Sequence, residues 1–303
     1  MNAEAILAIL ALFPAIVLGV YIYKKDKHEK EPWWLLALLF VAGIVITEIA
    51  ALLEGVLIAF TDSIFSGVAA NPSAATTGEF YAYQAAVNFG CIALVEEGLK
   101  WIPLLLLTKK SKHFNSLFDG VIYAVFVSLG FAAYENILYV FSYGWETGIM
   151  RAITAVPGHV FFAISMGYSY SFYHIYAKAQ NWEKELKQSG FLPFNATLME
   201  KSKKTYFTAS IVVPVIIHGL YDFMLSVESA LWICIFYIFL IAMYVFAFRT
   251  VNRFSKIDTN DNSFAAGIFI SRYPQAAVLF APPAPDTQTV NAMSENNTDT
   301  MNM

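Results

Sequence analysis

Charged side chains are scarce in this chain. Only 14% of its 303 residues are Asp, Glu, Lys or Arg, whereas 58% are hydrophobic. A soluble domain of this length cannot hide so much apolar surface in one core. The composition therefore excludes an ordinary soluble protein and predicts a polytopic membrane protein.

Cysteine, net positive charge and internal repeats are lacking as well. Cys91 and Cys234 both fall within apolar runs, which favours reduced packing residues over a disulfide framework. A formal net charge of −4 gives no overall basic surface, so a nucleic-acid partner is not expected. The absence of a duplicated half argues against a transporter built from repeats.

Long apolar runs are abundant instead. Runs of about 20 apolar residues can cross a hydrocarbon core of about 30 Å. Such runs lie near residues 5–23, 33–60, 82–107, 118–142, 152–177, 206–226 and 229–248. The sequence therefore predicts an all-α bundle of about seven transmembrane helices embedded in a lipid bilayer.

Basic residues lie in every second connection between the apolar runs. They gather after the first, third, fifth and seventh apolar runs, and Arg151 alone lies in the intervening connections. Because positively charged loops stay cytoplasmic, the pattern predicts an N-terminus outside and a C-terminus inside. It also favours an odd number of spans.

The composition changes near residue 256. Asn, Thr, Asp and Pro become frequent, and such a segment cannot bury enough apolar surface to fold alone. We therefore expect a transmembrane domain at residues 1–255 and a disordered cytoplasmic tail at 256–303. The semi-apolar stretch 264–281 is short and contains Arg272 and Pro274, so an eighth span is not expected.

Several ionisable side chains lie deep inside the apolar runs, where a central charge costs about 2.5–3.5 kcal/mol. At a rise of about 1.5 Å per residue, those on the third to sixth runs share one depth, from the midplane toward the outer leaflet. The sequence thus predicts one polar cluster built from four helices. The ionisable residues are Glu48, Glu54, Glu96, Glu97, Lys100, Glu135, His159, His218 and Asp222.

Spacing within the helices supports this cluster. His218 and Asp222 are four residues apart and project from one helix face. Lys100 is four residues from Glu96 and three from Glu97, so its ammonium can neutralise either glutamate and leave the other available for chemistry.

The inventory is typical of a metal hydrolase, which needs imidazole and carboxylate ligands, an open position for water and a general base. Glu135, His159 and His218 form a candidate zinc ligand set of two histidines and one carboxylate. The alternative is that such residues only link helices, at about 0.6 kcal/mol each. Glu48 and Glu54 fit that structural or cavity-lining role, but the others, on four helices at one depth, favour a site.

The remaining polar residues have predicted roles beside a metal. Glu96 would take a proton from the metal-bound water, and Glu97 would pair with Lys100. Asp222 would orient an imidazole or polarise the scissile carbonyl.

Three motifs resemble those of a known family. They are EEGLK at 96–100, FAAYE at 131–135 and HGLYD at 218–222, each on a separate apolar run. In this order the chain resembles the PrsW intramembrane proteases, a branch of the superfamily that includes the CAAX-prenyl endopeptidases and the bacteriocin-processing enzymes. The similarity covers roughly residues 10–250, and the ordered set is far more specific than any single motif.

The resemblance implies an intramembrane endopeptidase in a bacterial cytoplasmic (inner) membrane. Its substrate would be a membrane-anchored protein, typically an anti-sigma factor cut on its extracytoplasmic side to begin a regulatory cascade. Compared with the CAAX branch, Glu135 replaces a histidine and Asp222 replaces an asparagine, which leaves open both a zinc enzyme and a metal-free glutamate protease. The resemblance assigns functional importance to Glu96, Glu97, Glu135 and His218, with Lys100, His159 and Asp222 alongside.

Three other functions remain open on the sequence. A membrane scaffold or chaperone of the same fold would bind other helices without cutting them, but it would not need a general base. A CAAX-type processing peptidase would use a related site. A proton-coupled transporter could relay protons through the same side chains.

Overall fold

The described part of the chain is mostly helical. The computed structural model describes residues 3–27 and 29–280, and over these the single β-type contact is an isolated bridge between Ser116 and Asn260. The chain divides into two compact units, Met1–Ala265 and Ala266–Met303, and the first holds the helical bundle. The predicted all-α fold is confirmed.

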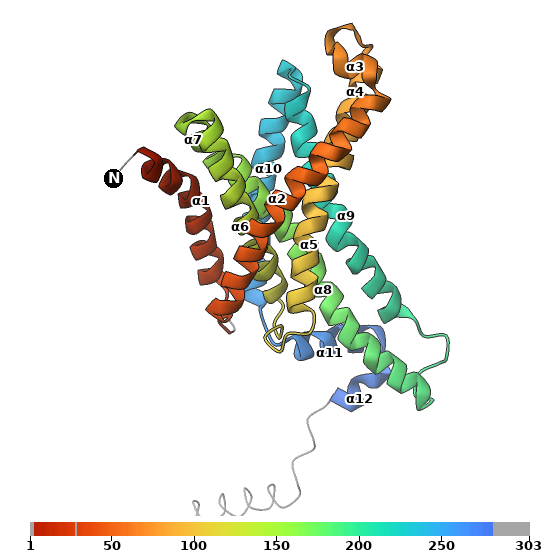
Figure 1. Ribbon diagram of the computed structural model, residues 1–303. Helices are drawn as coiled ribbons and strands as arrows, with labels where there is room; N and C mark the ends of the chain where they lie inside the picture. Colours follow the sequence, from red (N-terminus) through yellow and green to blue (C-terminus); the bar gives the residue numbers. More distant parts are fainter. Residues whose placement is uncertain (1–2, 28, 281–303) are drawn as a thin grey trace, which may run out of the picture. The chain divides into compact units, whose positions relative to one another are not determined.

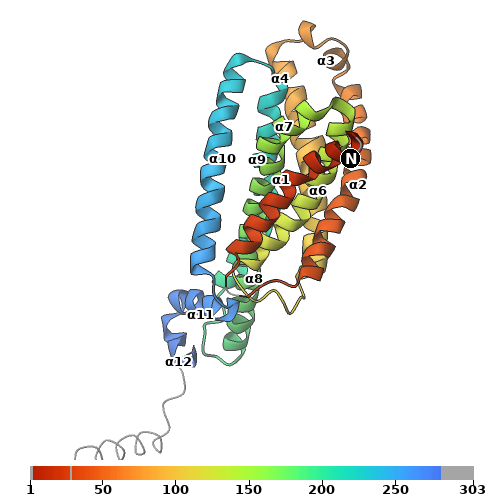
Figure 2. The same ribbon diagram turned by 90° about the vertical axis from the view of Figure 1, so that its left-hand side faces the viewer.

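Six helical segments within the described residues are long and apolar enough to cross a membrane. Each coincides with one of the predicted apolar runs. Figures 1 and 2 show them side by side, with α7 at one end of the bundle, here called the α7 end, and the α8–α9 connection at the other. The six are α1 (Ala3–Lys25), α2 (Trp33–Ile64), α6 (Asp119–Tyr143), α7 (Trp145–Ile153) continuing into α8 (Ala155–Gln188), α9 (Leu198–Ser226) and α10 (Ala230–Ile257).

The predicted run at 82–107 takes a different form. After the short elements α3 (Ser66–Ala70) and η1 (Pro72–Ala74), it consists of α4 (Thr77–Ala85), a π-helical segment η2 (Ala86–Ala93) and α5 (Leu94–Thr108). None of these pieces alone has the length of a spanning helix. The count of seven spans and the outside-to-inside orientation therefore stay predictions.

Helix α6 forms the centre of the bundle and approaches its neighbours at glycines. A Cβ atom on Gly130 would lie 1.9 Å from the carbonyl oxygen of Phe40 on α2, and one on Gly43 would lie 2.0 Å from that of Val127. A Cβ on Gly167 of α8 would lie 2.4 Å from the carbonyl oxygen of Gly120. Small residues let membrane helices touch backbone to backbone, so α2, α6 and α8 are held in close contact.

Part of the predicted tail is helical. Helix α11 (Asp261–Arg272) is followed by η3 (Pro274–Ala276) and α12 (Ala277–Phe280). The semi-apolar composition of 264–281 accounts for these elements, because it offers apolar side chains at helical spacing. Residues 281–303 lie outside the described residues, so disorder there stays a prediction.

A buried carboxyl group between α1 and α2 should make stability depend on pH. Glu31 is only 4% exposed and accepts a hydrogen bond from the Tyr123 hydroxyl. Burial and the nearby Asp119 raise the pKa of Glu31 to about 9, from 4.5, although the bond from Tyr123 lowers it. Between these two pH values the unfolded chain releases a proton that the folded chain keeps, so stability falls as pH rises.

We therefore expect Glu31→Gln to raise the thermal unfolding midpoint in detergent at pH 8, and to flatten its decline between pH 5 and pH 9. The exposed Glu185 provides a matched control, since Glu185→Gln should leave the decline as it is in the wild type. An equally steep decline in Glu31→Gln would contradict the assignment.

Candidate active site

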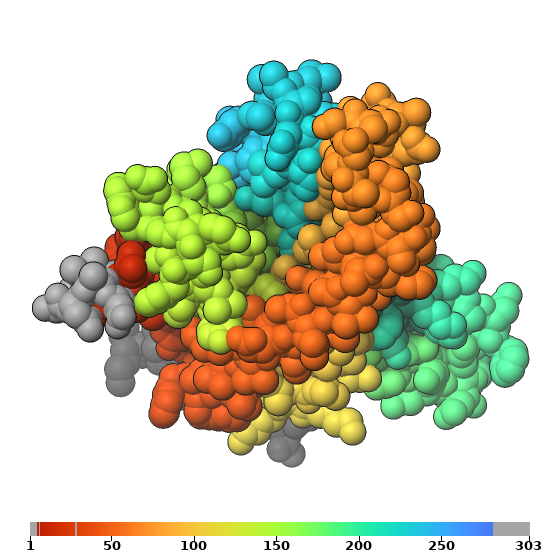
Figure 3. Space-filling view, turned by 45° about the horizontal axis from the view of Figure 1, so that its top comes forward, coloured from red at the N-terminus to blue at the C-terminus, as the bar shows by residue number. Residues whose placement is uncertain are grey.

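A cavity of about 500 Å³ collects most of the ionisable residues singled out in the sequence. It opens at the α7 end, where Figure 3 shows a hollow bounded by α7, by α2 with α4, and by the ends of α9 and α10. Its wall includes side chains from α2, η2, α5, α6, α7, α8 and α9. The ionisable residues in the wall are Glu54, Glu96, Glu135, Arg151, His159, His218 and Asp222.

Lys100 links the two glutamates of α5 to α8. Its side chain is buried, and Nζ donates hydrogen bonds to Glu96 Oε2 and Glu97 Oε1, each at 2.8 Å. It also lies 3.1 Å from Nδ1 of His159 and 4.0 Å from the ring centroid of Phe131. The helical spacing predicted a pair with one glutamate, whereas the ammonium contacts both.

The ring of His159 has a defined orientation. Pro157 occupies the first turn of α8, where its missing N–H costs no helical bond, and it places His159 just inside the helix. Because an ammonium group can only donate, Nδ1 of His159 accepts from Lys100. Nε2 therefore carries the hydrogen and donates to Glu135 Oε2 at 2.8 Å. The lone pair of Nδ1 points at the centre of the cluster.

His218 is held from both sides of its ring. Nδ1 lies 3.0 Å from Glu97 Oε1, and Nε2 lies 3.1 Å from Asp222 Oδ2, one helical turn further along α9. The ring also stacks on Phe162, with centroids 4.4 Å apart and an interplanar angle of 19°. These three contacts leave the imidazole little freedom to turn.

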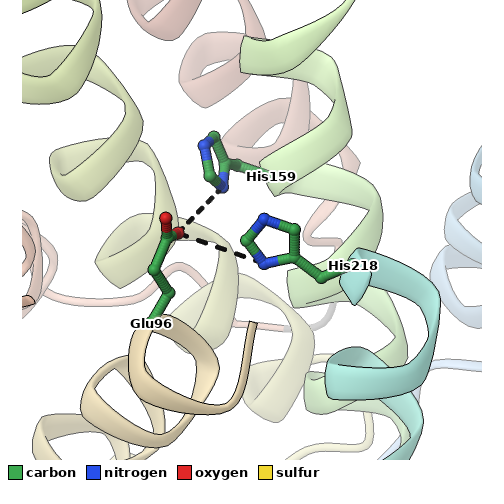
Figure 4. Close-up of side chains that lie close together, drawn as sticks. All are labelled: Glu96, His159 and His218. Atoms are coloured by element: carbon green, nitrogen blue, oxygen red, sulfur yellow. Dashed lines mark ion pairs between the residues drawn. The ribbon is translucent and has the colours of Figure 1, made fainter. Parts of the chain in front are cut away.

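One group of donor atoms in the described part of the chain is close enough to share a metal ion. Glu96, His159 and His218 are all buried, and each offers one atom within 4.8 Å of the others. Glu96 Oε2 lies 3.9 Å from His159 Nδ1 and 4.0 Å from His218 Nδ1 (Figure 4). Two imidazole nitrogens and a carboxylate oxygen that face one point suit zinc.

The predicted ligand set of Glu135, His159 and His218 stays a prediction, and the structure shows where Glu135 lies. It contacts Nε2 of His159, the nitrogen that points away from the cluster centre, and so is placed to orient this ring. Glu54 lines the cavity, as the sequence allowed, and its buried Oε1 has no hydrogen bond in the described structure. Glu48 lies outside the cavity and accepts a hydrogen bond from the Tyr134 hydroxyl.

Arg151 is the site residue that sequence reasoning missed. The structure places its guanidinium against Glu135, with Nη2 2.7 Å from Oε2, in the cavity wall. The sequence did give one indication of a special role. Arg151 is the one Lys or Arg in the connections that are expected on the outer side of the membrane.

Comparisons with known proteins agree with the motifs. The model of the family described as "PrsW family intramembrane metalloprotease" matches residues 31–248. The chain is 31% identical to a Protease PrsW of Clostridioides difficile (strain 630), over 78% of this chain and 87% of that protein. A Protease PrsW of Bacillus subtilis (strain 168) is 29% identical, over 81% and 94%. No solved structure matches the chain. The chain therefore belongs to the PrsW family of intramembrane metalloproteases.

Proposed function

We propose that this protease cleaves a membrane-anchored regulatory protein of the anti-sigma-factor kind, in a bacterial cytoplasmic membrane. The observation that carries the proposal is the buried group of Glu96, His159 and His218 in the wall of a cavity open at the α7 end. Lysine and arginine gather in alternate connections, and this pattern predicts that the α7 end lies outside the cytoplasm. A substrate would then be cut near its extracytoplasmic junction with the membrane.

Of Glu96 and Glu97, Glu96 is the one that can contact water in the cavity. It lines the cavity, whereas Glu97 is fully buried and does not. Glu96 Oε2 faces Lys100 and the two imidazoles, which leaves Oε1 to accept a proton from a water molecule in the cavity. Glu97 contacts Lys100 and Nδ1 of His218, and a metal bound to this nitrogen would replace the second contact.

The donor set fits a divalent metal such as zinc. His159, His218 and Oε2 of Glu96 would hold it, which leaves Oε1 of Glu96 for the proton. When bound, such a metal lowers the pKa of a water molecule and polarises a carbonyl group. Glu135 and Asp222 would keep the two imidazoles oriented through their outer nitrogens. Lys100 donates to two of the same three donor atoms, so it competes with a metal cation for them.

The metal content of purified variants tests this ligand set. We expect Glu96→Gln and His159→Ala to lose more metal affinity than Glu135→Gln, because each removes a ligand. Glu135→Gln removes only an orienting contact, which typically costs about 10- to 100-fold. Elemental analysis after dialysis against a graded chelator would measure the difference.

The opposite order, with Glu135→Gln losing metal first, would support the set of Glu135, His159 and His218 instead. An active wild-type preparation without stoichiometric metal would remove both sets. It would favour a metal-free glutamate protease.

The substrate class is tested by comparing membrane proteomes of cells that carry the wild type or Glu96→Gln. A membrane-anchored regulator should be found truncated on its extracytoplasmic side with the wild type alone. If no membrane protein differs between the two, the scaffold function gains support.

A further inference from the structure

The guanidinium of Arg151 contacts three side chains of α6. Nη2 is 2.7 Å from Glu135 Oε2, Nε donates to Asn136 Oδ1 at 3.1 Å, and the carbon Cζ lies 3.9 Å from the ring centroid of Tyr139. Glu135 and Tyr139 are four residues apart and share one face of α6, and Asn136 lies on the adjoining side. The side chain of Arg151 is only 14% exposed.

The turn between α6 and α7 makes this contact geometrically accessible. Gly144 has a φ of 91°, a value that L side chains rarely adopt, and it reverses the chain so that α7 packs back on α6. Arg151 stands in the last turn of α7 and reaches Glu135 two turns before the end of α6. Asn136 in turn donates from Nδ2 to the carbonyl oxygen of Ala11 on α1. These contacts therefore connect α7, α6 and α1.

A single oxygen atom joins Arg151 to the active site. Glu135 Oε2 lies 2.7 Å from Arg151 Nη2 and accepts from His159 Nε2 at 2.8 Å. A carboxylate at this depth of a membrane protein is stabilised by a nearby cation. With Arg151 removed, Oε2 keeps only the imidazole as a direct partner, and the carboxylate can swing toward cavity water. His159 would then lose the contact that fixes its outer nitrogen.

We propose that Arg151 is a positioning residue of the protease, which clamps Glu135 so that Glu135 holds the His159 ring with Nδ1 directed at Glu96. Arg151 does not touch the reacting atoms. Its effect passes through two side chains, and orienting contacts of this kind are worth about 10- to 100-fold in activity. The proposal rests on the proposed active site but on neither choice of metal ligands.

Kinetics of purified full-length variants provide the first test. We expect Arg151→Gln to lower kcat by about 10- to 100-fold with KM within about twofold, because the substrate still binds while the imidazole is misoriented. Arg151→Lys should have a much higher kcat than Arg151→Gln, since lysine keeps a positive charge beside Glu135 although it lacks the planar guanidinium. Glu146→Gln, on the exposed first turn of the same helix, should behave as the wild type.

A double-mutant cycle gives the sharper test. If Arg151 acts only through Glu135, Arg151→Gln/Glu135→Gln should have the kcat of Glu135→Gln alone. If the losses in kcat of the two single variants multiply in the double variant, the proposal is overturned. A wild-type kcat in Arg151→Gln would overturn it as well. A raised KM with unchanged kcat would overturn it too, because it would make Arg151 a substrate-binding residue. The double variant also carries no unpaired carboxylate at this position, so it stays informative if Arg151→Gln folds poorly.

Nitrogen NMR of histidine-labelled protein separates this inference from the proposed function. Arg151→Gln should shift the ring-nitrogen resonances of His159 and leave those of His113 unchanged. If the wild type cuts no membrane substrate, the proposed function fails, but the NMR result still decides whether Arg151 orients His159. Unchanged His159 resonances in Arg151→Gln would refute the clamp.

Discussion

Purified Glu96→Gln protein should keep its fold and lose cleavage of its membrane substrate by about 10²- to 10⁴-fold, the range attributed to a positioned proton acceptor. Glutamine has nearly the same shape, and its amide oxygen can still accept a hydrogen bond from Lys100. It cannot take a proton from water. Because Glu97 continues to neutralise Lys100 at 2.8 Å, the bundle should retain its thermal midpoint.

Glu48 offers a matched control for this experiment. It is also a carboxylate within a spanning helix, but it lies outside the cavity wall and accepts a hydrogen bond from Tyr134. Glu48→Gln should cleave at nearly the wild-type rate. A wild-type rate in Glu96→Gln would remove Glu96 from the mechanism.

Lys100→Met should destabilise the protein by about 3–5 kcal/mol, the cost of leaving a buried charge without its partner. Methionine fills much of the volume of the lysine stem, so packing is not the main loss. Glu96 and Glu97 would instead remain in an interior where each is at most 5% exposed, with no ammonium between them. A lower unfolding midpoint in detergent would measure the effect.

Two further variants separate charge from volume in this result. Lys100→Met/Glu97→Gln removes one of the two stranded carboxylates and should recover part of the lost stability. The exposed pair of Lys204 and Glu200 is also an i,i+4 ion pair, at 2.7 Å, and Lys204→Met should cost less than about 1 kcal/mol. Equal losses in Lys100→Met and Lys204→Met would show that burial of the charges does not matter.

Contacts within one helix were predictable from the sequence. The spacing of three and four residues predicted a contact of Lys100 with either glutamate and of His218 with Asp222. The structure has these pairs, with Lys100 in contact with both glutamates. Six of the predicted spans also appear as long apolar helices. Apolar length and helical spacing are local properties, so a single sequence carries them.

Contacts between helices were less predictable, because they depend on how each helix is rotated about its axis. Helix α6 is buried on nearly every side, so its hydrophobic pattern does not reveal which face Glu135 is on. The sequence could therefore bring Glu135 to the cluster but could not decide whether it faces the inner or outer nitrogen of His159. The π-helical segment before Glu96 was missed for a similar reason, since its apolar composition is that of an ordinary helix.

The glycine contacts of α6 concern a problem of any hydrolase within a membrane, which needs water at its site but must not let water or ions cross the bilayer. The cavity, open at the α7 end, is lined by Glu96 and His218 and is large enough to hold water. Beyond it, Gly43 with Gly130 and Gly120 with Gly167 bring three helices together backbone to backbone, too close for a column of water or ions. A site open to water on one side is thus compatible with a helix bundle that stays closed at these contacts.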